Sequence, residues 1–154
     1  MGPMDFALRL GDANDAVAVT AVVRAAYSKW VPVLGREPMP MRADYERNIQ
    51  QHRIEVLVRD GGVAAVLETI DRADHLWIEN IAVSPELQGN GLGHRLLAHA
   101  EELAVKLGAS GVRLLTNSAF ASNIALYSGV GYVVDRTEPF MGGTTVYLSK
   151  RLMR

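Results

Sequence analysis

The stretch that decides the fold runs from Ile81 to Leu107 and reads IAVSPELQGNGLGHRLLAHAEELAVKL. Its first residues continue an apolar run and predict a buried strand, which Ser84-Pro85 ends because proline cannot donate to a sheet ladder. Three glycines follow within positions 89–93, and apolar residues then recur on one helical face up to Leu107, with a glycine at the C-cap position. The pattern predicts a strand, a glycine-rich turn and a helix.

This construction predicts a ligand that carries phosphate. Glycines allow close approach of the backbone, and the first N–H groups of a helix have no partner inside the helix. A tight turn that only joins a strand to a helix is the alternative. The glycine spacing does not fit the dinucleotide fingerprint, since the third glycine would fall on His94 or Leu96, and a P-loop lysine is absent between Lys29 and Lys106.

Two stretches resemble the signatures of the GNAT N-acetyltransferase superfamily. Residues 83–93 (VSPELQGNGLG) resemble V-x-P-x-x-Q-G-x-G-[LI]-G, and residues 123–132 (NIALYSGVGY) resemble N-x-A-L-Y-x-x-x-G-[FY]. The resemblance covers about residues 5 to 150. It implies that acetyl-CoA is the co-substrate and that it is held by Ile81, Ala82, Val83, Gln88, Gly89, Asn90, Gly91, Leu92, Gly93, His94, Asn123 and Tyr127. Phe120 stands where many members of the family have an asparagine, so either Asn117 or Asn123 is expected to contact the pantetheine amides, and Asn123, which matches the subgroup that reads N-I-A-L-Y, would cap a helix instead or as well.

The remaining pattern predicts an α/β fold in a single domain, 1–154. Hydrophobic periodicity and turn signals predict strands at 6–10, 55–59, 63–70, 75–83, 111–116, 131–135 and 144–151, helices at 14–30, 44–52, 92–107 and 121–129, and an irregular loop over 31–41. The order β-α-α-β-β-β-α-β-α-β-β is that of a GNAT-like mixed β-sheet with helices on both faces, in which the strands flanking the glycine-loop helix run parallel.

The resemblance implies acetyl transfer to a primary amine. Tyr127 matches the tyrosine of the second signature and is predicted to be the general acid toward the leaving thiolate. Glu79 shares a strand face with Trp77, Ile81 and Val83, so we expect a partly desolvated carboxylate that acts as general base or holds the substrate ammonium. Glu37 is the alternative base, in a loop that walls the acceptor site in the family, and Tyr27 would reach that site from the end of its helix.

Composition narrows the partners. The chain has 154 residues, is 49% apolar and carries a net charge of -1, which gives no reason to expect binding to nucleic acid or to a membrane. No apolar run is predicted to reach the roughly 18 residues of a membrane-spanning helix. Cysteine is absent, which excludes an acyl-cysteine intermediate and favours direct transfer in a ternary complex. We expect no metal, because the four histidines are not spaced as ligands, and a cytoplasmic setting.

Other functions stay open. One alternative is transfer of a different acyl group, and another is a regulatory module that binds CoA without catalysis. A nucleotide-binding protein is the last alternative, and the glycine spacing disfavours it. The acceptor is either a small-molecule amine or a protein amine, and the final strands would permit a homodimer.

Overall fold

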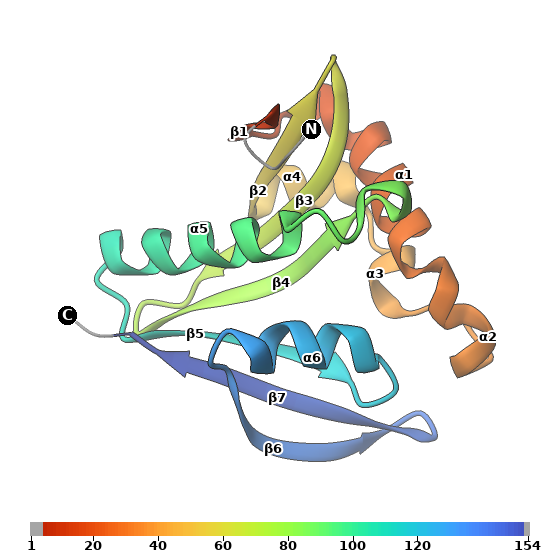
Figure 1. The fold of residues 1–154 in the computed structure, drawn as a ribbon, viewed down its shortest axis with the longest axis vertical. Helices are drawn as coiled ribbons and strands as arrows, with labels where there is room; N and C mark the ends of the chain where they lie inside the picture. Colours follow the sequence, from red (N-terminus) through yellow and green to blue (C-terminus); the bar gives the residue numbers. More distant parts are fainter. Residues whose placement is uncertain (1–4, 153–154) are drawn as a thin grey trace. The chain divides into compact units, whose positions relative to one another are not determined.

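The computed structural model describes residues 5–152, which form seven strands and the helices that connect them (Figure 1). The strands follow the hydrogen-bonded order β1-β2-β3-β4-β5-β7-β6. In chain order the elements are β1 (Ala7–Leu10), η2 (Ala13–Asp15), α1 (Ala16–Tyr27), η3 (Ser28–Trp30), α2 (Val31–Leu34), α3 (Met39–Arg42), α4 (Tyr45–Gln51), β2 (Arg53–Arg59), β3 (Gly62–Asp71), β4 (His75–Val83), η4 (Pro85–Leu87), α5 (Leu92–Lys106), β5 (Gly111–Asn117), α6 (Ala121–Gly129), β6 (Val133–Phe140) and β7 (Gly143–Arg151).

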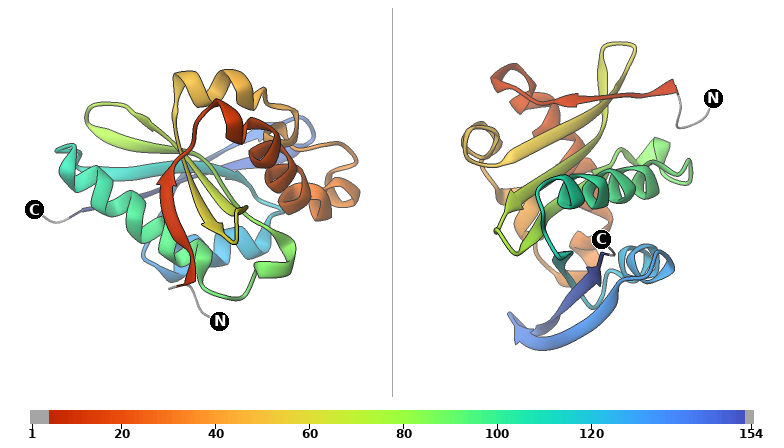
Figure 2. Two further views of the ribbon diagram at one scale, coloured as in Figure 1. Left: turned by 90° about the horizontal axis from the view of Figure 1, so that it is seen from above. Right: turned by 90° about the vertical axis from the view of Figure 1, so that its left-hand side faces the viewer.

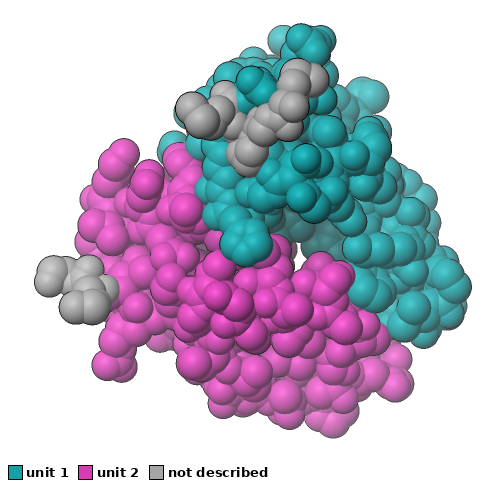
Figure 3. All heavy atoms as spheres, in the orientation of Figure 1, with its two compact units in different colours: residues 1–69, 80–96 teal, residues 70–79, 97–154 magenta. Residues whose placement is uncertain are grey.

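The chain divides into two compact units, coloured separately in Figure 3. Unit 1 runs up to Thr69 and resumes over Asn80–Leu96, and unit 2 comprises Ile70–Glu79 and the chain from Leu97 onward. The chain passes from one unit to the other within β3, within β4 and within α5. The expected mixed sheet is confirmed, whereas the single domain over 1–154 stays a prediction.

Unit 1 is built on the antiparallel strands β1, β2 and β3 and on helix α1, which contacts α3 and α4 (Figure 2). A capping box starts the helical stretch, because the Asp12 carboxylate accepts from the Asn14 N–H and the Asp15 carboxylate accepts from the Asp12 N–H. The buried face of α1 carries Val19, Val22, Val23, Ala26 and Tyr27, as its periodicity predicts.

The predicted irregular loop over 31–41 is wrong in part, since the structure has two short helices there, α2 and α3. Pro32 and Pro40 each lie at the first or second position of one of these helices. An N–H group at these positions has no partner inside the helix, so proline, which has no N–H, is tolerated there. Gly35 ends α2 with φ of 73°. The prolines that suggested a loop therefore start helices.

The helical segments from Ala13 to Leu34 join into one stretch of 22 residues that is long and apolar enough to cross a membrane, by length and composition alone. The sequence predicted no apolar run of this length. The difference arises because four consecutive helical segments, η2, α1, η3 and α2, follow one another without a break. Core helices of soluble proteins pass the same test, and α1 buries one face within unit 1.

Unit 2 contains the parallel pair β4–β5, which is in register from His75↔Gly111 to Ile78↔Leu114, and the antiparallel strands β7 and β6. The parallel crossover is as predicted. Residues on one face of β5 and β7 are buried, among them Leu114 and Leu148, and α6 lies along these strands (Figure 2). The edge strand β6 is exposed throughout and is longer than the predicted 131–135, since its pairing with β7 continues to Phe140↔Gly143.

Gly111 tests the packing of β5 on β7. A Cβ at this position would lie 2.6 Å from the Lys150 carbonyl oxygen, whereas a Cβ at Gly129 would meet nothing within 4 Å. We expect Gly111→Ala to lower the free energy of unfolding by about 1–3 kcal/mol, as overpacking does. Gly129→Ala should leave it unchanged or raise it slightly. Urea denaturation measures both, and equal stability of the two variants would contradict the close approach of β5 and β7.

Candidate functional site

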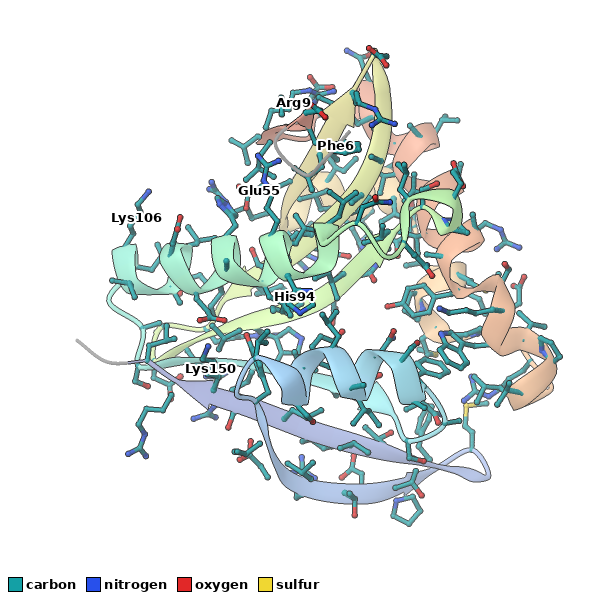
Figure 4. All side chains as sticks on the ribbon, in the orientation of Figure 1. Phe6, Arg9, Glu55, His94, Lys106 and Lys150 are labelled. Atoms are coloured by element: carbon teal, nitrogen blue, oxygen red, sulfur yellow. The ribbon has the colours of Figure 1, made fainter. Side chains whose placement is uncertain are left out.

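The glycine turn has the geometry that the sequence predicts. β4 ends at Val83, one turn of helix η4 follows, and Gly89 and Gly91 then adopt φ of 86° and 79°. A Cβ at Gly89 would meet nothing within 4 Å, so the turn is open on that side. The Arg95 N–H donates to the Gly91 oxygen at 3.0 Å and starts α5, whose first turn contains His94 (Figure 4). The N–H groups of this first turn are the ones that have no carbonyl partner within a helix.

Side chains of the turn brace its own backbone. Gln88 Nε2 donates to the Val83 oxygen at 3.2 Å, and Asn90 Nδ2 donates to the Leu87 oxygen at 3.0 Å. Lys29 Nζ donates to Gln88 Oε1 at 3.3 Å. Lys29 therefore places a cation beside the turn, and sequence reasoning missed it because 59 residues separate it from Gln88.

The end of β4 carries the backbone atoms predicted to contact acetyl-CoA. Ile81 to Val83 are the last residues of β4 and lie in unit 1. Ile81 and Ala82 are buried. Whether these backbone groups bind a ligand stays a prediction.

A buried hydrogen-bond chain lies in unit 1 beside this end of β4. Tyr27 Oη donates to Asn80 Oδ1 at 2.9 Å, and Asn80 Nδ2 donates to Tyr45 Oη at 3.0 Å. Burial raises the pKa of Tyr27 well above its ordinary value, and the nearby Glu68 carboxylate raises this pKa further. The Tyr27 hydroxyl is therefore protonated and engaged in the core. Sequence reasoning named Tyr27 but missed Asn80 and Tyr45, which no motif marks.

A second buried polar pair in unit 1 was also missed. Glu68 on β3 is only 1% exposed, and its Oε2 lies 2.6 Å from Nδ1 of the half-buried His52. A carboxylate at this depth needs a hydrogen-bonding partner to offset the loss of its hydration. The signal in the sequence was a lone acid within the apolar run of β3, flanked by Leu67.

Glu79 lies in unit 2 and is exposed, so the expectation of a partly desolvated carboxylate is wrong. The half-buried Trp77, two residues earlier on the same strand face, donates from Nε1 to Glu79 Oε1 at 3.1 Å. Sharing a face with apolar residues did not bury the carboxylate, because the face itself is open at this position. Its second oxygen and remaining lone pairs are able to accept from an ammonium group.

Tyr127 is buried on α6 in unit 2, and its ring lies 6.0 Å from that of Tyr132. α6 begins at Ala121 with Phe120 at the N-cap position, so the alternative of Asn123 as N-cap is wrong. Asn123 lies inside the first turn of α6 and is half-buried. Its contact with acetyl-CoA stays a prediction.

Glu37 lies in unit 1 between α2 and α3 and accepts a hydrogen bond from Arg24 Nη2 at 2.6 Å. Arg24 Nη1 also donates to the Met41 oxygen at 2.7 Å, so one guanidinium binds this segment to α1.

Among residues 5–152, no group of three or more His, Asp or Glu side chains is arranged to hold a metal ion.

Comparison with known proteins gives consistent matches. The model of the acetyltransferase (GNAT) family matches residues 20–132. The [ribosomal protein bS18]-alanine N-acetyltransferase of Escherichia coli K12 is 36% identical over 76 residues, 49% of this chain and 51% of that protein. An uncharacterized N-acetyltransferase of Bacillus subtilis, YvbK, is 37% identical over 74 residues, 48% of this chain and 46% of that protein. The chain thus spans about half the length of the curated relatives it matches.

Solved structures share the fold. The PaiA N-acetyltransferase of Thermoplasma acidophilum, in complex with coenzyme A, superimposes with a TM-score of 0.84 at 17% identity, covering 96% of this chain and 99% of that one. The Escherichia coli ribosomal-protein-S18-alanine N-acetyltransferase gives a TM-score of 0.77 at 21% identity, covering 95% and 93%. A Salmonella typhimurium acetyltransferase, YncA, with its cofactor acetyl-CoA gives 0.76 at 18% identity, covering 97% and 95%.

Two buried tyrosines allow a matched test of the polar chain. We expect Tyr27→Phe to cost about 1–3 kcal/mol of unfolding free energy, because Asn80 Oδ1 loses its buried donor. Tyr132→Phe removes a buried hydroxyl that has no hydrogen-bond partner in the described part of the chain, so its cost should stay within about 0.5 kcal/mol. Urea denaturation compares them. Equal losses would mean that the Tyr27 hydrogen bond contributes nothing specific.

Proposed function

Because this chain belongs to the acetyltransferase (GNAT) family, we propose that it transfers an acetyl group from acetyl-CoA to a primary amine by direct attack in a ternary complex. The observation that carries the proposal is the turn at 88–93, with two left-handed glycines before a helix of 15 residues. Such a turn presents backbone N–H groups and the positive end of a helix to an anion. The pyrophosphate of acetyl-CoA is that anion.

The turn fits the pyrophosphate physically. The open side at Gly89 admits a ligand to the backbone, and the side chains of Gln88 and Asn90 point back to the turn and leave this approach clear. Lys29 adds a positive charge beside the turn. We assign the pyrophosphate to residues 88–94, the thioester end to the backbone of Ile81 to Val83, and the pantetheine amides to Asn123.

The chemistry needs one proton acceptor and one proton donor. The acceptor ammonium loses a proton to Glu79, directly or through water, or to Glu37 as the second candidate. The free amine then attacks the thioester carbon and forms the C–N bond, the C–S bond breaks, and the leaving thiolate takes its proton from the Tyr127 hydroxyl. The second proton of the attacking nitrogen leaves as the amide forms and restores the Tyr127 hydroxyl, directly or through water. Tyrosine is available for this step because its ordinary pKa of about 10 keeps it protonated at neutral pH, so it has a proton to donate to the developing thiolate.

We propose a protein amine as the first acceptor to test. The Escherichia coli relative is named for acetylation of an alanine of ribosomal protein bS18. The exposed Glu79 is compatible with a large acceptor, since a peptide reaches a carboxylate at the surface without entering a cavity. A small-molecule amine is the alternative, and tests with both kinds of acceptor decide. We further propose a cytoplasmic location, one folded domain and a homodimer.

Acetyl-CoA binding tests the proposal first. At about 100 times its dissociation constant, acetyl-CoA should add roughly 2.7 kcal/mol of stability in thermal unfolding, whereas NAD and ATP should add none. Gly89→Ala should weaken binding about tenfold or more, equal to about 1.4 kcal/mol, because a side chain would obstruct the turn. Gly61→Ala is the matched control, since Gly61 also has positive φ and open space but lies in the β2–β3 turn. Stabilisation by NAD or ATP instead of acetyl-CoA would refute the proposal.

Substitution of the two proposed catalytic residues tests the chemistry. We expect Tyr127→Phe to lower kcat by roughly 10²–10⁴-fold, as loss of a general acid does, and Glu79→Gln to lower kcat in the same range. Thiol release with a panel of amines and peptide N-termini measures turnover, and Tyr132→Phe is the control for loss of a buried tyrosine hydroxyl. Unchanged turnover in Tyr127→Phe would remove the acid role. Binding of acetyl-CoA without turnover of any acceptor would favour the regulatory module, and turnover only with a longer acyl-CoA would favour another acyl group.

A further inference from the structure

A chain of three hydrogen bonds connects four elements of unit 1, and the two bonds that Asn80 makes are buried. It passes from Tyr27 on α1 to Asn80 on β4, from Asn80 to Tyr45 on α4, and from Tyr45 Oη to the Pro40 oxygen in α3 at 2.8 Å. Tyr27, Tyr45 and Asn80 are all buried, and Asn80 is only 4% exposed. Water does not compete for the two buried bonds of Asn80, so they constrain their partners strongly, whereas the Tyr45–Pro40 bond is partly buried.

The direction of the chain follows from its end. A carbonyl oxygen only accepts, so Tyr45 must donate its single O–H proton to Pro40. Tyr45 Oη then accepts from Asn80, which orients the Asn80 amide with Nδ2 toward Tyr45 and Oδ1 toward Tyr27. Tyr27 must therefore donate. The three donors point the same way, from α1 and β4 toward α3.

The first donor of the chain has two acceptors. Tyr27 Oη lies 2.9 Å from Asn80 Oδ1 and 3.4 Å from the Ile81 oxygen, and it has one proton to donate. A shift of the Ile81 backbone toward Tyr27 would draw the proton from Asn80, and a shift away would strengthen the bond to Asn80. The position of Ile81 would in this way act on the bonds that reach Pro40.

We infer that Asn80 is a positioning residue that transmits the occupancy of the acetyl-CoA site at Ile81–Val83 to the segment 37–42, which contains α3 and Glu37. The inference rests on the proposed function, because it requires acetyl-CoA to contact this end of β4. Its physical basis is that the segment is held at the core by the Tyr45–Pro40 bond and at the surface by Arg24. Acetyl-CoA binding therefore changes the order of the segment before an acceptor arrives.

Hydrogen exchange with and without acetyl-CoA tests the inference. The Met41 N–H, which donates to the Pro38 oxygen at 3.0 Å, reports on the order of α3. In the wild-type chain, saturating acetyl-CoA should change exchange at Met41 by about fivefold or more, the lower range of coupling between sites. In Tyr45→Phe the response should be lost, although calorimetry still shows acetyl-CoA binding. Asn80→Leu is the second variant and should behave alike.

Arg24→Gln is the matched control, because it releases the same segment from the surface side and leaves the buried chain intact. Its exchange should be faster overall, but the response to acetyl-CoA should persist. A response that survives in Tyr45→Phe, or an absent response in the wild type despite binding, would overturn the inference. Absence of acetyl-CoA binding in the wild type would refute the proposed function instead, and calorimetry separates these outcomes.

Discussion

The first N–H groups of any helix, α5 included, have no acceptor within the helix itself, so the turn before α5 decides what they meet. Gly89 and Gly91 turn the backbone through left-handed conformations, which brings the chain to the helix without a side chain over its end. The side-chain amides of Gln88 and Asn90 donate to the Val83 and Leu87 oxygens, and Gln88 Oε1 accepts from Lys29. Because N–H groups at a helix N-terminus attract an anion, this geometry supports the proposal that the turn binds the pyrophosphate of acetyl-CoA.

In unit 1, hydrogen bonds between buried polar side chains determine how α1, α4 and β4 are arranged. An asparagine in the middle of a core is costly unless its amide is fully bonded, and Asn80 has a donor in Tyr27 and an acceptor in Tyr45. These bonds have to form together, so the ends of α1, α4 and β4 have one mutual arrangement. Hydrophobic burial alone would tolerate small slides between them.

The sequence predicted the elements whose signals are local. The turn after β4 and the helix α6 follow from glycine, proline and periodicity over a few neighbouring residues, and α6 has the predicted bounds. The sequence did not predict the length of β6, because strand pairing determines it: β6 extends to Phe140 as it pairs with β7. In the same way, the motif residues of the site were recognisable, whereas the bond from Tyr27 to Asn80 joins residues 53 apart and no local pattern marks it.

Glu79 shows why a strand pattern gives the side of a residue but not its burial. Alternation correctly put Glu79 on the face of Trp77, yet an apolar neighbour buries a carboxylate only when another layer covers both. Here no layer of unit 2 covers Glu79, and the indole donates to it. The same openness suits the proposed role, because a base that serves a large amine must be reached from solvent. Because Glu79 is exposed, the proposed base does not depend on a pKa raised by desolvation. It depends on the position of the carboxylate, which the hydrogen bond from Trp77 fixes.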